Sequence, residues 1–141
     1  MKNSPDGALI AAIMLPVKPR TKKNHSTIIH QGRRHILLPS KQYKDFEQLC
    51  KPHIQAAWTQ APIDFGISIE AAVYLDTKRA GDHCGYLQAI GDMLQAHGVV
   101  ADDKWITWLV PPNGHWLRWD KATPRIELTI RRCKHPLESS N

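Results

Sequence analysis

A chain of 141 residues with 42% hydrophobic content is long enough for one domain with its own core and too short for two comfortable ones. Its net charge of +6 and pI near 9.4 favour a polyanionic partner. The three cysteines form no CxxC pair, which argues against a disulfide framework and favours a reducing, cytoplasmic setting. The apolar run Leu9–Val17 is too short for a signal or membrane segment, so no membrane partner is expected.

The first third of the chain predicts three strands. Leu9–Val17 is expected to form a buried strand, and a basic loop follows it. Ser26–His30 and Arg33–Leu38 are expected to pair as a hairpin around Gln31 and Gly32, because glycine can take the positive φ of such a two-residue connection.

A helix is expected to follow, with Ser40 as its N-cap and its end near Trp58. Apolar residues at helical spacing give it a stripe that faces the core: Tyr43, Phe46, Leu49 and Cys50. Because proline lacks the backbone N–H and clashes with the preceding turn, Pro52 is expected to kink or split this helix.

The second half of the chain predicts further strands and one more helix. The strands are expected at Ile67–Leu75, Trp105–Val110 and Arg125–Arg131, of which the first and last alternate apolar and polar residues. The helix is expected to span His83–His97, with Asp82 as N-cap and Gly98 as its stop.

These elements predict a single small α+β domain in which helices pack on a mixed β-sheet. The domain is expected to span residues 1–133, and residues 134–141 are expected to form a short flexible tail.

The charge pattern singles out the window from Gly81 to Asp103. It holds four aspartates and no lysine, arginine or glutamate, although residues 1–60 carry ten Lys and Arg against three Asp and Glu. Clustered carboxylates repel each other, and their hard oxygens suit Mg²⁺ or Mn²⁺, which in turn bind phosphate. An acidic centre in a basic protein is the charge layout of a nuclease.

Spacing limits how the four aspartates can meet. Asp82 and Asp92 are separated by ten residues, roughly 15 Å of helix rise, so they cannot share one metal on an intact helix. Beyond Gly98 the chain can reverse and return roughly 15 Å toward the middle or the beginning of the helix. A site that joins Asp82 to Asp103 is therefore permitted but not required. Taken singly, Asp82 is explained as a helix cap, Asp92 as a solvated residue, and Asp102 and Asp103 as a turn.

A resemblance rests on these residues. Residues 78–94 read Lys-Arg-Ala-Gly-Asp-His-Cys-Gly-Tyr-Leu-Gln-Ala-Ile-Gly-Asp-Met-Leu, and residues 98–103 read Gly-Val-Val-Ala-Asp-Asp. This run resembles the core of the RusA family of Holliday junction resolvases. Segments 18–24, 38–43, 114–121 and 124–129 resemble flanking parts of the family, so the resemblance covers about residues 9–130.

The resemblance implies a homodimeric α+β endodeoxyribonuclease that resolves four-way DNA junctions in recombination and repair. It implies Mg²⁺, with Mn²⁺ as a substitute, held by Asp82 and Asp103, with Asp102 as a further acidic group beside them. Asp92 or Asp102 is then expected to orient or deprotonate the attacking water, and Lys104 to offset charge on the phosphate. The implied setting is the cytoplasm of a bacterial host, and a phage or prophage origin fits the family.

The chain departs from the family pattern at three positions. Cys84 stands where some members have a second acid, Gly85 where the family has Asn, and Gln88 where some members have Lys. A non-catalytic protein that binds DNA structure with the same fold is therefore the alternative function, and a small RNA-binding or other basic protein without a metal is a third.

Basic residues near the N-terminus are the candidate DNA-binding groups. Together with Lys104 they are Lys18, Arg20, Lys22, Lys23, Arg33 and Arg34. Their clustering in a loop and hairpin favours phosphate contact over ordinary surface charge. Four tryptophans within fifteen residues could stack on unpaired bases, although core or interface packing explains most of them better: Trp105, Trp108, Trp116 and Trp119.

The eight histidines do not predict a zinc site, because none of them forms a His/Cys cluster at ligand spacing. The sequence also lacks a phosphate-binding glycine loop and a G-x-S-x-G motif.

Overall fold

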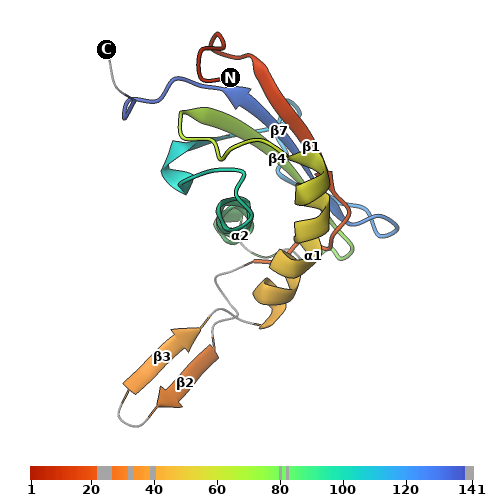
Figure 1. The fold of residues 1–141 in the computed structure, drawn as a ribbon. Coiled ribbons are helices and arrows are strands. Elements are labelled where there is room, and N and C mark those ends of the chain that lie inside the picture. Colours follow the sequence, from red (N-terminus) through yellow and green to blue (C-terminus); the bar gives the residue numbers. More distant parts are fainter. Residues whose placement is uncertain (22–26, 32–33, 39–40, 80, 82, 139–141) are drawn as a thin grey trace.

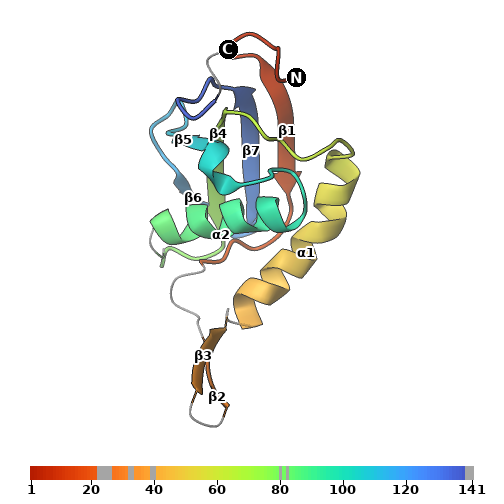
Figure 2. The same ribbon diagram turned by 60° about the vertical axis from the view of Figure 1, so that its left-hand side comes forward.

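The computed structural model of the protein describes residues 1–21, 27–31, 34–38, 41–79, 81 and 83–138. The central strand of its sheet is β4 (Ile67–Leu75), which pairs antiparallel with β7 (Arg125–Arg132). Beyond β7 lies β1 (Leu9–Leu15), also antiparallel, at one edge of the sheet. Figure 2 shows the three long strands side by side.

Two short strands share the other side of β4. β5 (Ile106–Leu109) runs parallel to the first residues of β4, and β6 (Leu117–Trp119) runs parallel to its last residues. The sheet is therefore mixed and five-stranded, as expected, but the sequence did not predict β6. Three residues are too few for an alternating pattern to be recognised.

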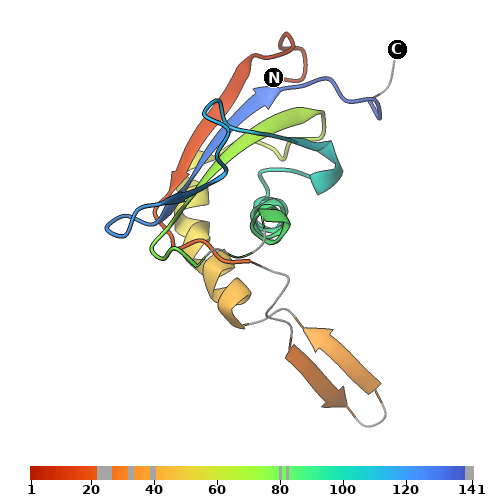
Figure 3. The ribbon, with the colours of Figure 1, turned by 180° about the vertical axis from the view of Figure 1, so that it is seen from behind.

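Both helices cover one face of this sheet (Figures 1 and 3). The alternation along β7 explains why one face is chosen: Ile126, Leu128 and Ile130 are buried, whereas Glu127 keeps part of its surface exposed. β1 was expected to be a buried strand, and this holds for one face only: Ile13 and Leu15 are buried, whereas Leu9 is 58% and Met14 is 55% exposed at this sheet edge. The fold class, a small α+β domain with helices on a mixed sheet, is confirmed.

Helix α1 (Lys41–Ala57) buries Tyr43, Phe46, Cys50 and Ile54. Leu49, expected in that stripe, is 59% exposed, because the buried positions repeat every three or four residues and Leu49 falls outside them. The expected split at Pro52 is also wrong. The helix continues through Pro52, which is exposed, so its ring lies away from the core.

Helix α2 (His83–Ala96) crosses the sheet below β4 and β7 in the view of Figure 2. The large side chains that α2 buries are those of Tyr86, Ile90, Met93 and Leu94. Gly98 ends the helix with φ of 78°, a conformation that glycine adopts without steric cost, and this confirms the predicted stop.

The hairpin of β2 (Thr27–Gln31) and β3 (Arg34–Leu38) projects from the body of the molecule, as Figures 1 and 3 show. Its pairing is antiparallel, and His30 pairs with His35 rather than with Arg33 as predicted, so the register differs by two residues. The predicted turn residue Gly32 lies outside the described residues.

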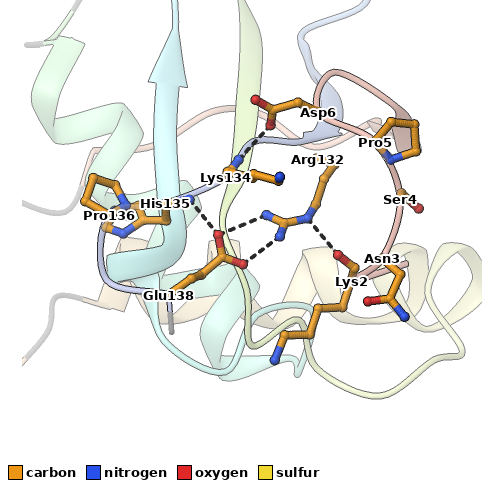
Figure 4. Close-up of a pocket in the computed structure, with 10 residues that line it drawn as sticks. All are labelled: Lys2, Asn3, Ser4, Pro5, Asp6, Arg132, Lys134, His135, Pro136 and Glu138. Carbon is orange, nitrogen blue, oxygen red and sulfur yellow. Dashed lines mark hydrogen bonds and ion pairs between the residues drawn. The ribbon is translucent and has the colours of Figure 1, made fainter. Parts of the chain in front are cut away.

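Residues 2–6 and residues 132–138 lie together at the C-terminal end of β7 (Figure 4). Arg132 is 5% exposed and forms an ion pair of 2.7 Å with Glu138. Its guanidinium also donates to the carbonyl oxygens of Gly66 and Lys2, at 2.9 and 3.1 Å. The predicted boundary after Cys133 stays a prediction, and Glu138 lies beyond it in contact with the domain.

Among the described residues, no helix combines the length and apolar character that a membrane crossing requires.

Candidate active site

The chain reverses after α2 and brings the closing pair of aspartates back to the helix. Residues 99–101 are held by the loop before β4, because the N–H of Ile63 donates to Val99 O and the N–H of Ala101 donates to Ile63 O, both at 2.9 Å. The next residues form a short 3₁₀ turn, η1 (Asp103–Trp105). This return was the condition for the predicted site.

Asp103 lies beside the middle of α2. Its backbone N–H donates to Gln95 Oε1 at 3.1 Å. A Cβ placed on Gly91 would lie 4.0 Å from the Cβ of Asp103. The charge of Asp92 acts on the Asp103 carboxyl, so these two aspartates are neighbours although eleven positions separate them in the sequence.

Asp102 completes a group of three aspartates. Its carboxylate accepts the N–H of Lys104 at 2.9 Å and so caps η1. The pKa of Asp103 is raised by partial removal from water, then by a side-chain hydrogen bond with Asp102 and by the charges of Asp102 and Asp92. Asp103 keeps much of its surface exposed, so a cation could reach its carboxylate from solvent.

The fourth aspartate, Asp82, lies outside the described residues. The pairing of Asp82 with Asp103 therefore stays a prediction. Gly91, beside Asp103, lies eight residues beyond the helix start at His83, roughly 12 Å along the axis. Among the residues that the structure describes, no three His, Cys, Asp or Glu side chains are placed to hold a metal ion by themselves.

Two neighbours of this group were not singled out by the sequence. Tyr43 of α1 is buried, and its pKa is raised by burial, by a hydrogen bond with Glu47 and by the charges of Glu47 and Asp92. Gln95 contributes the amide oxygen that fixes Asp103. Tyr43 gave only a core signal at helical spacing, so its proximity to Asp92 depends on how α1 and α2 pack.

The basic loop after β1 lies near the beginning of α2. Lys18 Nζ forms an ion pair of 3.0 Å with Asp76, which follows β4. Thr21 is buried against Gly81, where a Cβ would come within 2.8 Å of its methyl carbon, so glycine permits this approach. The Gly81 N–H donates to the hydroxyl of Tyr86 on α2 at 3.1 Å. These contacts bring residues 18–21 of the basic loop next to residues 76–81, although about sixty positions separate the two segments.

The structure locates only some of the candidate DNA-binding groups. Lys18 and Lys104 are exposed and Arg20 is half-buried. Lys104 Nζ lies 4.9 Å from the ring centre of Trp105. The remaining candidates fall outside the described residues or have undescribed side chains: Lys22, Lys23, Arg33 and Arg34.

The four clustered tryptophans separate into two groups. Trp105, Trp108 and Trp116 are half-buried, and the ring of Trp108 packs against α2, 3.5 Å from a Cβ placed on Gly91. Trp119 differs, because it is 55% exposed at the end of β6.

A cavity of about 870 Å³ lies between the chain ends (Figure 4). Lys2, Asp6, Arg132 and Glu138 are among its lining residues, which include none of the four window aspartates. Arg132 and Glu138 are paired with each other, and Asp6 accepts the backbone N–H of Lys134, so the acids of this cavity serve the fold and the aspartate group remains the candidate active site.

The fold and the site define a small basic α+β protein. Its site is a group of three aspartates, one on α2 and two in the segment that folds back onto α2. The family of endodeoxyribonuclease RusA matches residues 16–131, which is most of the chain. The chain therefore belongs to the RusA endodeoxyribonuclease family, and the resemblance seen in the sequence is confirmed. A comparison with curated proteins finds no match.

Proposed function

We propose that this protein is a divalent-metal-dependent endodeoxyribonuclease that resolves four-way DNA junctions by phosphodiester hydrolysis, in recombination and repair. The observation that carries the proposal is the convergence of Asp92, Asp102 and Asp103, with the raised pKa of Asp103, in a chain of an endodeoxyribonuclease family. Acids brought together by tertiary structure, with the pKa of one of them shifted, are typical of reaction sites.

The donors present fit a hard divalent cation such as Mg²⁺. Asp103 already experiences two like charges, so a cation at this place would relieve repulsion that the bare protein carries. We propose Asp82 and Asp103 as the ligands, with Asp102 and Asp92 beside them. When bound, Mg²⁺ would neutralise phosphate oxygens and make water more acidic.

The protein's own groups then have separate tasks. The hydrogen bond from the Asp103 N–H to Gln95 Oε1 and the cap formed by Asp102 hold η1 against α2, so the carboxylates are positioned before substrate arrives. Asp92 or Asp102 would accept the proton of the attacking water. Lys104, exposed next to the pair, would contact the charged phosphate.

The basic loop and the hairpin are proposed to hold the DNA backbone. They carry Lys18, Arg20, Lys22, Lys23, Arg33 and Arg34. Changing Lys22 and Lys23 to alanine should make the slope of log affinity against log salt shallower by roughly one to two units, at about 0.9 per lost phosphate contact. An unchanged slope would mean that both lysines are ordinary surface charges that do not contact phosphate.

We further propose that the enzyme acts as a homodimer in the cytoplasm of a bacterial cell, with a phage or prophage origin. A two-fold dimer offers two matching sites to the two related strands of a symmetric junction, so paired cuts follow from symmetry.

The decisive experiment incubates the wild-type protein with a labelled four-way junction in Mg²⁺, in Mn²⁺ and in chelator. A linear duplex of the same sequence serves as the control substrate. We expect nicking of the junction with both metals, stronger with Mn²⁺, because Mn²⁺ tolerates softer neighbours such as Cys84. Chelator should stop the reaction.

A matched pair of variants tests the ligand set. Asp82→Asn and Asp92→Asn remove the same charge from the two candidate positions, and calorimetric titration with Mn²⁺ measures what each loses. Loss of binding in the first variant alone supports the predicted Asp82–Asp103 pair. Loss in the second alone would replace Asp82 by Asp92 as ligand.

A second candidate function is a DNA-structure-binding protein without catalysis. The observation that favours it lies at the first turn of α2, where Cys84 is exposed and Gly85 is buried, so this turn offers no second acid and no amide side chain. Tight junction binding without a cut product in either metal would establish this alternative.

A further inference from the structure

The end of β6 carries an aromatic ring that the fold leaves in solvent. Trp119 is 55% exposed, whereas Trp58 is 8% exposed in the core. A tryptophan buries a large apolar area when it packs, so exposing its ring forgoes stabilisation that the rest of this small domain would gain. A partner that covers the ring would recover this stabilisation.

The backbone that presents Trp119 is fixed on both sides. Trp119 stands opposite Leu75 at the end of the parallel β4–β6 pair, and the next N–H, of Asp120, donates to Leu75 O at 2.8 Å. The Asp120 carboxylate accepts the N–H groups of Ala122 and Thr123 at 3.2 and 3.1 Å.

The same carboxylate ties the turn to β7. It accepts the Thr123 hydroxyl at 2.8 Å and forms an ion pair of 2.9 Å with Arg125. The guanidinium of Arg125 in turn lies 3.7 Å from the ring centre of Tyr74. The exposed ring thus stands on a rigid turn, which suits a binding surface that has to be ready before its partner arrives.

One lysine lies over the exposed ring, and further cationic side chains are close in sequence to the ring or to that lysine. Lys78 Nζ lies 4.9 Å from the ring centre of Trp119. Arg79 and Lys121 are exposed nearby in sequence, and Arg118 is held by the Tyr74 hydroxyl at 2.7 Å. Among the described residues, acids at this end of the sheet are paired within the chain, Asp76 with Lys18, and Asp120 and Glu127 with Arg125. The surface around the ring is therefore positively charged.

We propose that Trp119 is a stacking platform for an unpaired base of branched DNA, with Lys78 contacting the adjacent phosphate. This inference rests on the proposed DNA substrate. Aromatic rings with neighbouring cations are the arrangement that binds single-stranded nucleic acid, because every base offers a π-face and every nucleotide a charge. An unpaired base is what a junction centre offers and a linear duplex does not.

The platform is separated along β4 from the tryptophan that packs beside the aspartates. Trp108, which packs against α2 beside Gly91, is paired with Ile69 of β4, and Trp119 is paired with Leu75. These positions are six residues apart on one strand, roughly 20 Å, or about six base-pair steps of DNA. A base held on Trp119 would therefore fix where the cut falls relative to the junction centre.

The test measures binding and cut position separately. Junctions carrying 2-aminopurine at an unpaired central position are titrated with wild-type protein, Trp119→Ala and Trp119→Phe in Ca²⁺, which permits binding. We expect Trp119→Ala to bind about tenfold more weakly, as one lost base stack predicts, and to quench 2-aminopurine fluorescence less. Trp119→Phe should retain most of both signals.

The control variant is Leu49→Ala, which removes a comparably exposed apolar side chain, 59% exposed, from α1. It should bind as the wild type does. Mapped cut sites, in Mn²⁺, should spread over neighbouring positions in Trp119→Ala and stay sharp in Leu49→Ala.

The outcomes separate this inference from the proposed nuclease. Wild type that binds and quenches without cutting supports the platform while the nuclease proposal fails. Equal affinity and quenching in wild type and Trp119→Ala overturns the platform even if cleavage persists. A change of sedimentation from dimer to monomer in Trp119→Ala also overturns it, because Trp119 would then belong to the interface between two copies.

Discussion

Two aspartates of this protein show opposite responses to their surroundings. The pKa of Asp120 is lowered to about 2 by hydrogen bonds from Thr123 and by Arg125. The pKa of Asp103 is raised by partial burial and by Asp102 and Asp92. One carboxylate is surrounded by donors and the other by acceptors. The first arrangement stabilises a turn, and the second brings like charges together, which is typical of a reaction site.

The Arg132–Glu138 pair extends this comparison to the chain ends. Glu138 has a pKa lowered to about 2, chiefly by Arg132 and by the backbone N–H of His135. It too has its partners within the chain. The carboxylates of Asp120 and Glu138 are thus part of the fold, and function is expected where the charges of Asp92, Asp102 and Asp103 meet.

The largest effect is expected from Asp103→Asn. This change should lower junction cleavage by at least about a thousandfold, because bound metal supplies several kcal/mol of transition-state stabilisation. Junction binding should stay the same or tighten, since one repulsive charge is lost. The measurement is single-turnover cleavage beside gel-shift affinity, with Asp64→Asn, which removes the same charge from an exposed aspartate, as the matched control. Full cleavage by Asp103→Asn would break the comparison, because Asp103 would then be no more functional than Asp120.

The next effect concerns stability. Glu138→Ala should reduce the free energy of unfolding by about 3 kcal/mol, since it leaves the buried Arg132 without its partner. The control is Glu127→Ala, which breaks the 3.7 Å contact of a 41% exposed glutamate with Arg125 and should lose less than about 1 kcal/mol. Denaturant unfolding measures both, and equal losses would remove the distinction between them.

The pH dependence of that stability follows from the sign of the shift. The folded-state pKa of Glu138 lies below its ordinary value of 4.5, so its contribution to stability is present above about pH 4.5 and is lost as the pH falls toward 2. Glu138→Ala should lack this part of the acid transition.

A gain of function is expected from Cys84→Asp. It adds an acid to the first turn of α2, where Cys84 is exposed, and should raise Mg²⁺-supported cleavage about tenfold if this turn faces the metal. Cys84→Ser is the control, since it adds polarity without charge. Unchanged activity in both would place the metal away from the helix start, nearer to Asp92.

The smallest expected effect is the difference between the pKa values of Asp103 and Asp120, which tests their comparison directly. Carbon NMR titration in chelator should find Asp120 deprotonating near pH 2 and Asp103 above its ordinary value of 3.8. Because the folded pKa of Asp103 is raised, its favourable contribution is present at low pH and lost as the pH rises through that value. Asp103→Asn should therefore stabilise the metal-free protein at neutral pH, by less than about 1 kcal/mol. A destabilised variant would contradict this reasoning.

The sequence by itself determined the fold class, both helices, the long strands, the family and the acidic window. These follow from local pattern: alternation along β4 and β7, helical spacing in α2, and the glycine at 98 that ends it. Local pattern failed where packing decides. Leu49 and one face of the edge strand β1 were predicted to be buried but are exposed, β6 was too short to predict, and α1 continues through Pro52.

Only the tertiary structure decided which residues meet. The reversal after Gly98 placed Asp103 beside the middle of α2, next to Asp92, where spacing had allowed either the middle or the beginning of the helix. Packing of α1 on α2 brought Tyr43 toward Asp92, and the parallel β4–β6 pair left Trp119 in solvent on a fixed turn. Periodicity reports which face of an element is buried, but contacts between elements depend on turns and packing far apart in sequence.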